Sequence, residues 1–244
     1  MFYRESLSQF NIKNFSLWVV LAAQAGIINV GGFLACHRFV THTTGFATFF
    51  ATDVAKARYS DAIGMLAVPG FFMLGAMISG FFVDRRILKN LRPNYSLILF
   101  FMALIQWSIF VFGSLGNLGP FGNGLLESKD YVILIGLCLA SGLQNAVITS
   151  ASQSVIRTTH LTGFTTDLGI GLVRLIFSTH KESQQQELEA SYMRLGIILA
   201  FVFGSMVGAF AFTEYHYYAF IIPGLISSAL WFLSIQTSIR NAHP

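Results

Sequence analysis

The chain carries one eight-residue pattern twice: residues 41–48 read THTTGFAT and residues 159–166 read THLTGFTT, with six of the eight positions identical. Each copy follows a long apolar run, and each joins a histidine to a glycine. Glycine adopts backbone conformations that interrupt a helix at little steric cost. The repeated pattern therefore predicts a fold that is built twice around the same interruption.

The residues around the two copies match as well. Before the pattern, AGIIN at 25–29 aligns with SGLQN at 141–145, and after it LGAM at 74–77 resembles FGSM at 203–206. Three matched blocks in one order are typical of an internal duplication. We therefore divide the single membrane domain into two halves, residues 1–126 and 127–244.

The composition is that of a membrane protein. Of the 244 residues, 54% are hydrophobic and 11% are charged, and the mean hydropathy is +0.63. Soluble domains carry roughly 25% charged residues because their surface faces water. With 25 phenylalanines as well, most of this surface must face lipid. The basic residues lie in short loops between apolar runs, so the net charge of +4 does not indicate nucleic acid as a partner.

Six runs without Asp, Glu, Lys or Arg are long enough to cross a bilayer core, which takes about 20 apolar residues. They are residues 14–36, 62–83, 93–126, 131–156, 195–213 and 217–239. The third run is too long for one crossing, and its tail at 113–124, rich in Gly and Asn, predicts a loop. We expect an all-α fold, a polytopic transmembrane helical bundle.

The segment after each repeated pattern is too short or too charged for a comfortable crossing. Residues 43–52 give only ten positions before Asp53, and residues 161–177 are interrupted by Asp167 and Arg174. A charge at the bilayer centre costs about 2.5–3.5 kcal/mol on insertion scales. We therefore expect one short broken or re-entrant helix in each half and six full spans, three to a half.

The distribution of basic residues tests this topology. With six spans and a cytoplasmic N-terminus, eleven of the fifteen Lys and Arg residues lie inside and four outside. Eight spans give nine against six, and seven spans, with only 161–177 crossing, scatter them almost evenly. Six spans are favoured over these two alternatives. Three crossings per half give the halves opposite orientations, an inverted repeat of the kind found in several secondary transporters.

Breaks in the backbone within a bilayer are tolerated only where protein or water replaces lipid. We expect breaks at the glycine pair 31–32 and at both repeated patterns, with Thr44 and Thr162 capping short helices that start at Gly45 and Gly163. The free N–H groups at these helix starts would hold an anionic or strongly polar group.

Several uncharged polar side chains and two histidines stand beside these breaks. His42 and His160 titrate near neutrality, so they are candidates for binding a solute or carrying a proton. Asn29, Gln144 and Asn145 lie in otherwise apolar helices, where they either link helices by hydrogen bonds or line a solute site. Their shared spacing ahead of the repeated patterns favours the lining role.

Charged residues near the patterns form a further group. Asp167, together with His160, is a candidate for proton coupling, because acidic residues at membrane depth are usually functional. Arg157 either clamps a carboxylate or phosphate or sets the topology. Asp53 lies beside a charged loop, and we expect it at a solvated helix end.

The remaining features predict packing. Cys36 and Cys138 fit small buried residues, and two histidines without nearby cysteines or paired carboxylates are too few ligands for a metal site. We expect no metal and no cofactor. Gly204 and Gly208 suit a close helix crossing, either inside the bundle or in a homo-oligomer. Residues 182–189, with their run of glutamines, predict a solvated loop.

The second half also resembles a known family. GLQNA at 142–146, RTTHLTG at 157–163 and TDL at 166–168 are similar to the signature of the YoaK-type bacterial membrane proteins, a group of unknown function. The resemblance covers nearly the whole chain. It implies a multi-pass protein of the bacterial cytoplasmic membrane, with transport as the expected activity.

The first half departs from the pattern of that family. Asn29 stands where the family has an aspartate, and Phe46 follows Gly45 where the family has an asparagine. The missing carboxylate weakens any proton- or ion-coupling role at that position.

Together these features favour a secondary transporter or permease for a small polar or anionic solute, bound near mid-bilayer where the halves meet. The alternative is a non-transporting sensor or assembly partner in the membrane, and a channel is left open as well. An enzyme is disfavoured, because the sequence pairs no Ser or Cys nucleophile with a base. The expected partners are the lipid bilayer and an unknown small solute.

Overall fold

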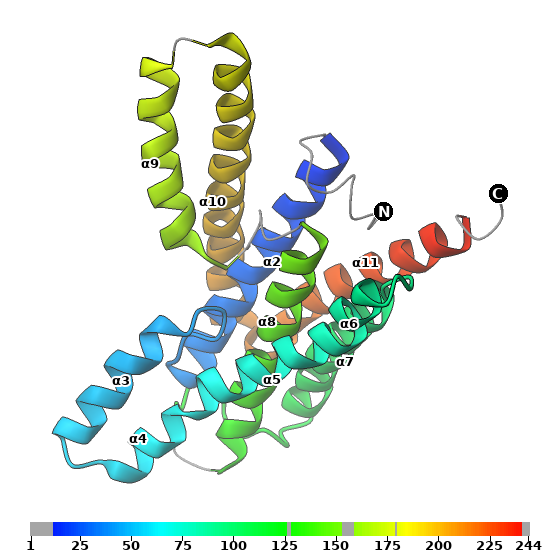
Figure 1. Ribbon diagram of the computed structural model, residues 1–244. Helices are drawn as coiled ribbons and strands as arrows, with labels where there is room; N and C mark the ends of the chain where they lie inside the picture. The colour runs from blue at the N-terminus through cyan, green and yellow to red at the C-terminus, as the bar shows by residue number, and fades with distance from the viewer. Residues whose placement is uncertain (1–11, 126–127, 153–158, 179, 241–244) are drawn as a thin grey trace.

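The computed structural model describes residues 12–125, 128–152, 159–178 and 180–240. Every regular element in these ranges is helical, which confirms the all-α class. In chain order the elements are α2 (Ile12–Cys36), α3 (Thr44–Ala55), α4 (Tyr59–Met65), α5 (Ala67–Phe82), α6 (Asp84–Leu88), α7 (Tyr95–Ser114), α8 (Ser128–Ala151), α9 (Leu161–Phe177), α10 (Lys181–Tyr215), the 3-10 helix η1 (His216–Phe220) and α11 (Ile221–Arg240) (Figure 1).

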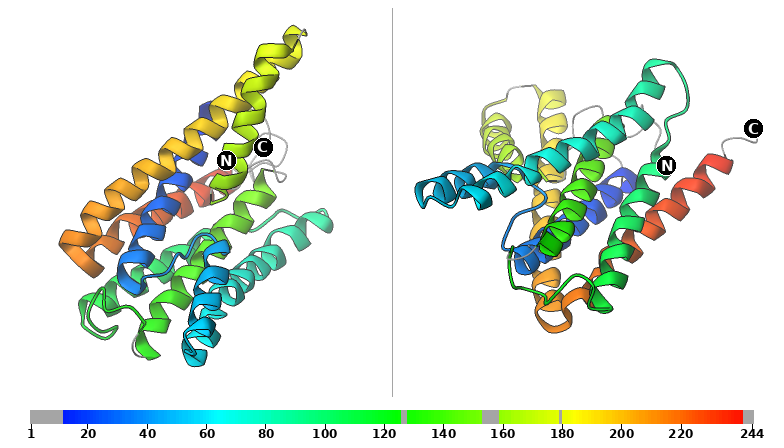
Figure 2. Two further views of the ribbon diagram at one scale, coloured as in Figure 1. Left: turned by 90° about the vertical axis from the view of Figure 1, so that its left-hand side faces the viewer. Right: turned by 90° about the horizontal axis from the view of Figure 1, so that it is seen from below.

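Among the described residues, five helical segments are long and apolar enough to cross a membrane. They are Phe15–Cys36, Tyr59–Leu88, Tyr95–Ser114, Asp130–Ala151 and Lys181–Thr237. The last has 57 residues and contains α10, η1 and most of α11, and the chain changes direction between α10 and α11 (Figure 2). The chain is thus a membrane protein with several candidate transmembrane helices.

The expected loop at 113–124 is also confirmed. Helix α7 ends at Ser114, and four glycines of the following segment have positive φ angles, between 75° and 87°. They are Gly116, Gly119, Gly122 and Gly124. A residue with a Cβ is strained in this conformation, so the glycines allow the chain to turn back toward α8.

Two helices form the centre of the bundle. In the apolar stretches of α2 and α8, 67% and 61% of the residues are buried. The corresponding shares in the other three candidate spans are 22%, 39% and 33%. Helix α10 packs along α2, α5 packs along α8, and α7 packs along α11. Figures 1 and 2 show that α2 and α8 run in opposite directions. Each central helix is therefore covered by a helix from the other half of the chain.

Glycines bring the backbones of these packed helices into contact. A Cβ added at Gly26 or Gly204 would meet backbone atoms across the α2–α10 crossing, and one added at Gly75 or Gly142 would do so across the α5–α8 crossing. Gly208 faces α2 as well, where its Cβ would lie 3.0 Å from the Cα of Ile27. The face with Gly204 and Gly208 is thus occupied within the chain, as small residues at membrane helix crossings often are.

Two expectations about helix boundaries are wrong. The glycine pair 31–32 does not break α2, which continues to Cys36; a Cβ at Gly31 would meet the Phe212 ring and one at Gly32 would meet Val40, so the pair makes room for packing. The expected loop at 182–189 is the start of α10 instead. Its polar side chains pair with one another along the helix, as in the 2.9 Å bond from Gln185 to Glu189.

Two short helical arms project from opposite ends of the bundle (Figure 1). The first is α3 with α4, and it follows the central helix α2. The second is α9, which packs on α10 and follows the central helix α8. Each arm therefore begins where the central helix of its own half ends, at the repeated pattern.

The glycine crossings make a direct prediction. In Gly142→Ala the new methyl group meets backbone atoms of α5, which cannot move aside as a flexible side chain would. We expect a destabilisation of about 1–3 kcal/mol, typical of overpacking, measured as a lower thermal unfolding midpoint in detergent. Gly169→Ala is the matched control, because nothing lies within 4 Å of a Cβ at that position. Equal midpoints for the two variants would contradict the proposed crossing.

Candidate functional site

The break after α2 is held by one amide. Asn29 is 7% exposed, and its Oδ1 accepts hydrogen bonds from the Thr41 hydroxyl at 3.0 Å and from the backbone N–H groups of Val40 and Thr41 at 3.4 Å each. These bonds supply an acceptor to two buried backbone N–H groups in the segment that follows α2. Asn29 thus fixes the path of the chain from α2 into the first repeated pattern.

The same bond occurs after α8. The hydroxyl of Thr159 donates to Oδ1 of Asn145 at 2.9 Å. Thr41 and Thr159 are the first residues of the two repeated patterns, and Asn29 and Asn145 close the two matched upstream blocks. The neighbouring Gln144 has another role, because its Nε2 donates to the carbonyl oxygen of Leu21 at 2.7 Å and so joins α8 to α2.

The starts of the short helices differ from expectation. Helix α3 starts at Thr44 with Thr43 at the cap position, and α9 starts at Leu161 with His160 there; neither cap makes a side-chain hydrogen bond. The prediction that Thr44 and Thr162 cap helices starting at Gly45 and Gly163 is therefore wrong. An N-cap residue normally has non-helical φ and ψ angles. Thr43 already has helical angles, so α3 begins before Thr44 could act as its cap.

The two pattern glycines lie close to aromatic rings of their own half. A Cβ at Gly45 would be 3.0 Å from the Phe39 ring, and one at Gly163 would be 2.5 Å from Nδ1 of His160. Thr162 and His160 are exposed, and so is Asp167 on the outer side of α9. Arg157, the candidate anion clamp, lies outside the described residues.

His42 is held against an aromatic ring. It is half-buried, its imidazole stacks on Phe39 with ring centroids 4.8 Å apart, and its Nδ1 lies 3.4 Å from the Thr41 hydroxyl. Burial lowers the pKa of His42 below its ordinary value, because desolvation disfavours the charged form. His42 therefore favours the neutral ring, which can both donate and accept a hydrogen bond.

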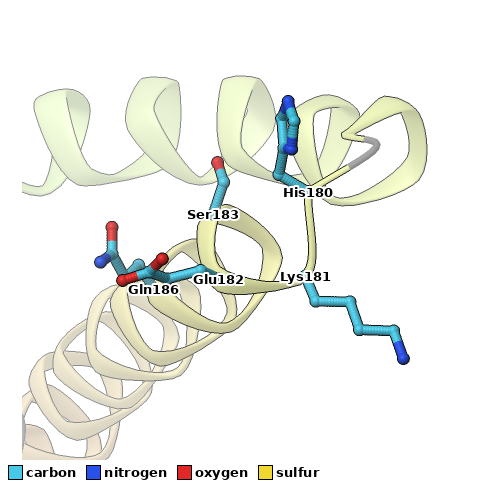
Figure 3. Close-up of a pocket in the computed structure, with 5 residues that line it drawn as sticks. All are labelled: His180, Lys181, Glu182, Ser183 and Gln186. Carbon is cyan, nitrogen blue, oxygen red and sulfur yellow. The ribbon is translucent and has the colours of Figure 1, made fainter.

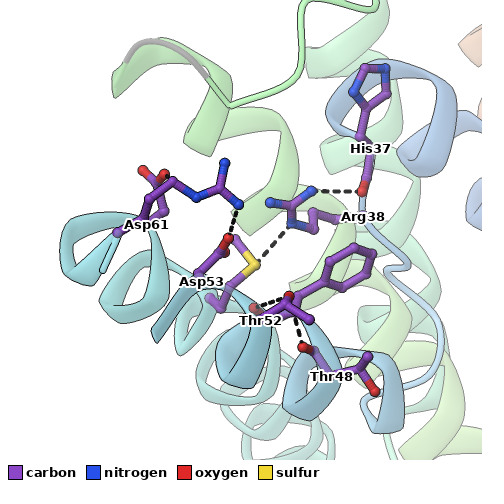
Figure 4. A network of polar contacts seen from close by, with 9 residues as sticks. His37, Arg38, Thr48, Thr52, Asp53 and Asp61 are labelled. Atoms are coloured by element: carbon purple, nitrogen blue, oxygen red, sulfur yellow. Dashed lines mark hydrogen bonds and ion pairs between the residues drawn. The ribbon is translucent and has the colours of Figure 1, made fainter. Parts of the chain in front are cut away.

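A charged network lies at the turn between α3 and α4 (Figure 4). The Asp53 side chain is only 3% exposed and forms an ion pair with Arg58, which also approaches Asp61 at 3.8 Å. The expectation of a solvated Asp53 is wrong, because the turn into α4 brings Arg58 back over the carboxylate. Arg38 completes the network, with Nε 2.9 Å from the Met65 sulfur and its guanidinium 4.4 Å from the centre of the Phe49 ring.

The second arm is polar where it meets α10. Glu187 of α10 pairs with Arg194 at 2.6 Å and with Arg174 of α9 at 3.4 Å. A surface hollow lies at the tip of this arm, lined by His180, Lys181, Glu182, Ser183 and Gln186. In Figure 3 the side chains of His180 and Ser183 point to one side of the turn and Lys181 points away. The residues that the structure describes contain no group of three or more His, Cys, Asp or Glu placed to bind a metal.

Sequence reasoning missed a buried polar cluster in the middle of the bundle. Gln24, Gln106 and Ser227 are each 0% exposed and come from α2, α7 and α11. Gln24 and Gln106 each stand in the middle of a long apolar run, and that isolation is the signal that identifies them. The repeated patterns indicate sites at the helix ends and not in the middle of the bundle.

The Asn29 bonds predict a structural role that can be measured. Asn29→Leu removes the acceptor for the Thr41 hydroxyl and two backbone N–H groups, and we expect a loss of about 1–3 kcal/mol because buried donors stay unpaired. Thermal unfolding in detergent measures it, with exposed Asn117→Leu as the control. A double-mutant cycle with Thr41→Val should show that the two effects do not add; additive losses would contradict the direct bond.

His42 predicts a pH dependence with a definite sign. As the pH falls from about 7.5 to about 5.5, the unfolded chain takes up a proton at His42 that the folded chain resists, so the folded state loses stability. His42→Phe keeps the stacking on Phe39 but has no titrating ring. The thermal unfolding midpoint of this variant should therefore fall less than that of the wild type when the pH is lowered. The exposed His180→Phe serves as control, and an unchanged pH slope in His42→Phe would refute the assignment.

Comparison with known proteins gives one match. The model of a family described as "Protein of unknown function (DUF1275)" matches residues 17–233, from the first turns of α2 to the last turns of α11. No curated protein and no solved structure matches the chain.

Proposed function

We propose that this chain, which belongs to the DUF1275 family of YoaK-like membrane proteins, is a secondary transporter or permease for a small polar or anionic solute. The match to this family covers nearly the whole chain and confirms the resemblance seen in the sequence. The family carries no assigned substrate, so the proposal rests on the architecture.

The observation that carries the proposal is the matched pair of helix breaks. Asn29 bonds to Thr41 after one central helix, and Asn145 bonds to Thr159 after the other, at 3.0 Å and 2.9 Å. Figure 1 shows these central helices running in opposite directions. Two copies of one interrupted unit in opposite orientations are the plan of several secondary transporters, whose solute sites lie where the copies meet.

The crossing glycines support the division into two repeats, residues 1–126 and 127–244. Gly26 and Gly142 come from the matched upstream blocks, and Gly75 and Gly204 come from the matched downstream blocks. Gly26 lies against the helix of Gly204, and Gly142 lies against the helix of Gly75. Exchanging the halves therefore exchanges one crossing for the other, as a two-fold repeat requires.

The length of the last apolar segment supports six crossings. Its 57 residues would extend about 85 Å as one straight helix, nearly three times the thickness of a bilayer core of about 30 Å. The turn at η1 divides it into α10 and α11, so we count two crossings there and three in each half. We propose a cytoplasmic N-terminus, because this orientation puts most of the basic residues inside, and a location in the bacterial cytoplasmic membrane, as the family resemblance implies.

Because the two breaks lie at opposite ends of the bundle (Figure 1), in this proposal the solute meets the polar groups of the two halves in turn, one group at each end of its path. His42, Asn29, Thr44 and Gly45 contribute from the first break, and the corresponding group contributes from the second break: His160, Thr162, Gly163, Gln144, Asn145 and Arg157. Protonation of His160 and Asp167 couples transport to a proton gradient. No step of this function makes or breaks a covalent bond.

One feature favours the alternative of a non-transporting assembly partner. Helix α9 exposes Ile170, Val173, Ile176 and Phe177 on its outer side, although its other side is polar. Such a helix at the end of a bundle can dock on another membrane protein as well as on lipid.

Reconstitution distinguishes these functions. We expect proteoliposomes to take up at least one solute from a panel of small polar and anionic compounds with saturation, and the same solute to raise the thermal midpoint of the detergent-solubilised protein. If uptake is driven by a pH gradient, His160→Ala should abolish that dependence while leaving the fold intact. Linear, non-saturating flux would indicate a channel, and no flux with any solute would favour the assembly partner.

A further inference from the structure

The middle of the bundle holds three buried polar side chains that the helix breaks leave unused. Gln24 stands twelve residues from either end of α2 (Ile12–Cys36), Gln106 lies near the middle of α7, and Ser227 lies on α11. All three are 0% exposed. A helix rises about 1.5 Å per residue, so Gln24 is about 18 Å from each end of α2 and close to the bilayer midplane.

These side chains point at one another across three helices. The Nε2 group of Gln24 donates to the Ser227 hydroxyl at 2.5 Å, and it lies 3.5 Å from both Oε1 of Gln106 and the carbonyl oxygen of Pro223. One amide nitrogen therefore contacts three acceptors although it has only two hydrogens. The two N–H groups of Gln24 therefore cannot satisfy all three acceptor oxygens at once.

Two atoms of the cluster have no hydrogen-bond partner among the described residues. They are Oε1 of Gln24, an acceptor, and Nε2 of Gln106, a donor. Buried amide atoms nearly always find partners, because an unpaired one costs free energy in a low-dielectric interior. The protein thus offers one unpaired acceptor and one unpaired donor near mid-membrane. A primary amide carries the matching groups, an N–H donor and a carbonyl acceptor.

The surroundings of the cluster carry no charge. Residues 15–36, 95–114 and 221–237, which are the apolar parts of α2, α7 and α11, contain no Asp, Glu, Lys, Arg or His. An ion bound there would find no counter-charge on these helices, and burying an unpaired charge is far more costly than burying an amide. The cluster therefore selects against anions and cations alike.

The walls of the cluster come from two helix pairs, which η1 joins at one end. Helices α7 and α11 are joined by the bond from Trp107 Nε1 to Ser228 at 3.0 Å, and Gly224 lets α11 approach the Trp107 ring. Gln24 comes from α2, whose main neighbour is α10. A shift of the α7–α11 pair away from α2 would open the cluster without breaking the contacts inside either pair.

We propose that Gln24, Gln106 and Ser227 form a further solute-binding site at mid-membrane, between the two helix breaks and closed in this conformation, and that the solute is a small uncharged molecule of the amide class. This inference rests on the proposed transport function and narrows its substrate. The solute's N–H donates to Oε1 of Gln24, and its carbonyl oxygen accepts from Nε2 of Gln106. Both unpaired atoms are then satisfied in the loaded site.

The test compares acetamide with acetate, which differ by a charge at nearly equal size. Proteoliposomes are placed in isotonic acetamide or acetate near neutral pH, and swelling is followed by stopped-flow light scattering. The wild type should admit acetamide faster than protein-free vesicles and acetate no faster. Gln24→Met and Gln106→Met should each reduce the added acetamide permeability by about tenfold, as expected for one lost hydrogen bond of this kind. The matched control is Gln236→Met, at an exposed position of α11.

A second measurement separates binding from folding. In Gln106→Met, methionine removes the unpaired Nε2 at similar volume, so this variant should melt at or above the wild-type temperature in detergent, whereas Gln24→Met also loses the bond to Ser227 and should melt below it. Acetamide should raise the wild-type midpoint, acetate should not, and the rise should be lost in both Met variants. If a variant fails to fold, this difference between acetamide and acetate in the wild type still decides.

The outcomes distinguish the two proposals. Unchanged acetamide permeability in both Met variants would overturn the assignment of the site. Wild-type flux of acetate or another ion without flux of acetamide would overturn it too, although the transporter itself would stand. Absence of flux for every solute tested would remove both.

Discussion

Contact between helix backbones at glycine is the constraint on which the rest of the molecule depends. In lipid, apolar side chains gain little by leaving the solvent, so helices associate through close packing and a few hydrogen bonds. Here the close crossings join α2 to α10 and α5 to α8, each pair made of one helix from either half. Neither half can therefore close its own core.

This interlocking changes which parts of the molecule can move as units. A transporter built from two separate halves would rock one half against the other, but these halves share both crossings. The units defined by packing are instead mixed pairs: α2 with α10, α5 with α8, and α7 with α11. The buried glutamines lie on the boundary between the first pair and the third. The asparagines at the helix breaks lie within their own halves and hold the chain in place.

The sequence predicted the framework well and the local chemistry less well. Apolar runs and the duplicated blocks located α2, α5, α7 and α8, because span length and repetition are properties of the chain itself. The polarity of residues 182–189 fits a loop and a solvated helix equally, so the sequence alone does not distinguish the two. The burial of Asp53 depends on Arg58, which reaches the carboxylate only because the chain turns between α3 and α4. The role of Gln24 depends on Gln106 and Ser227, which are more than eighty residues away along the chain.

Helix α10 is longer than a membrane is thick. Its 35 residues extend about 52 Å, whereas a bilayer core measures about 30 Å, and its first turns carry the charges that bind α9. One unbroken rod thus connects the water-exposed tip of the second arm to the glycine contact with α2. A displacement of α9 would therefore be transmitted along a single helix to the contact with α2.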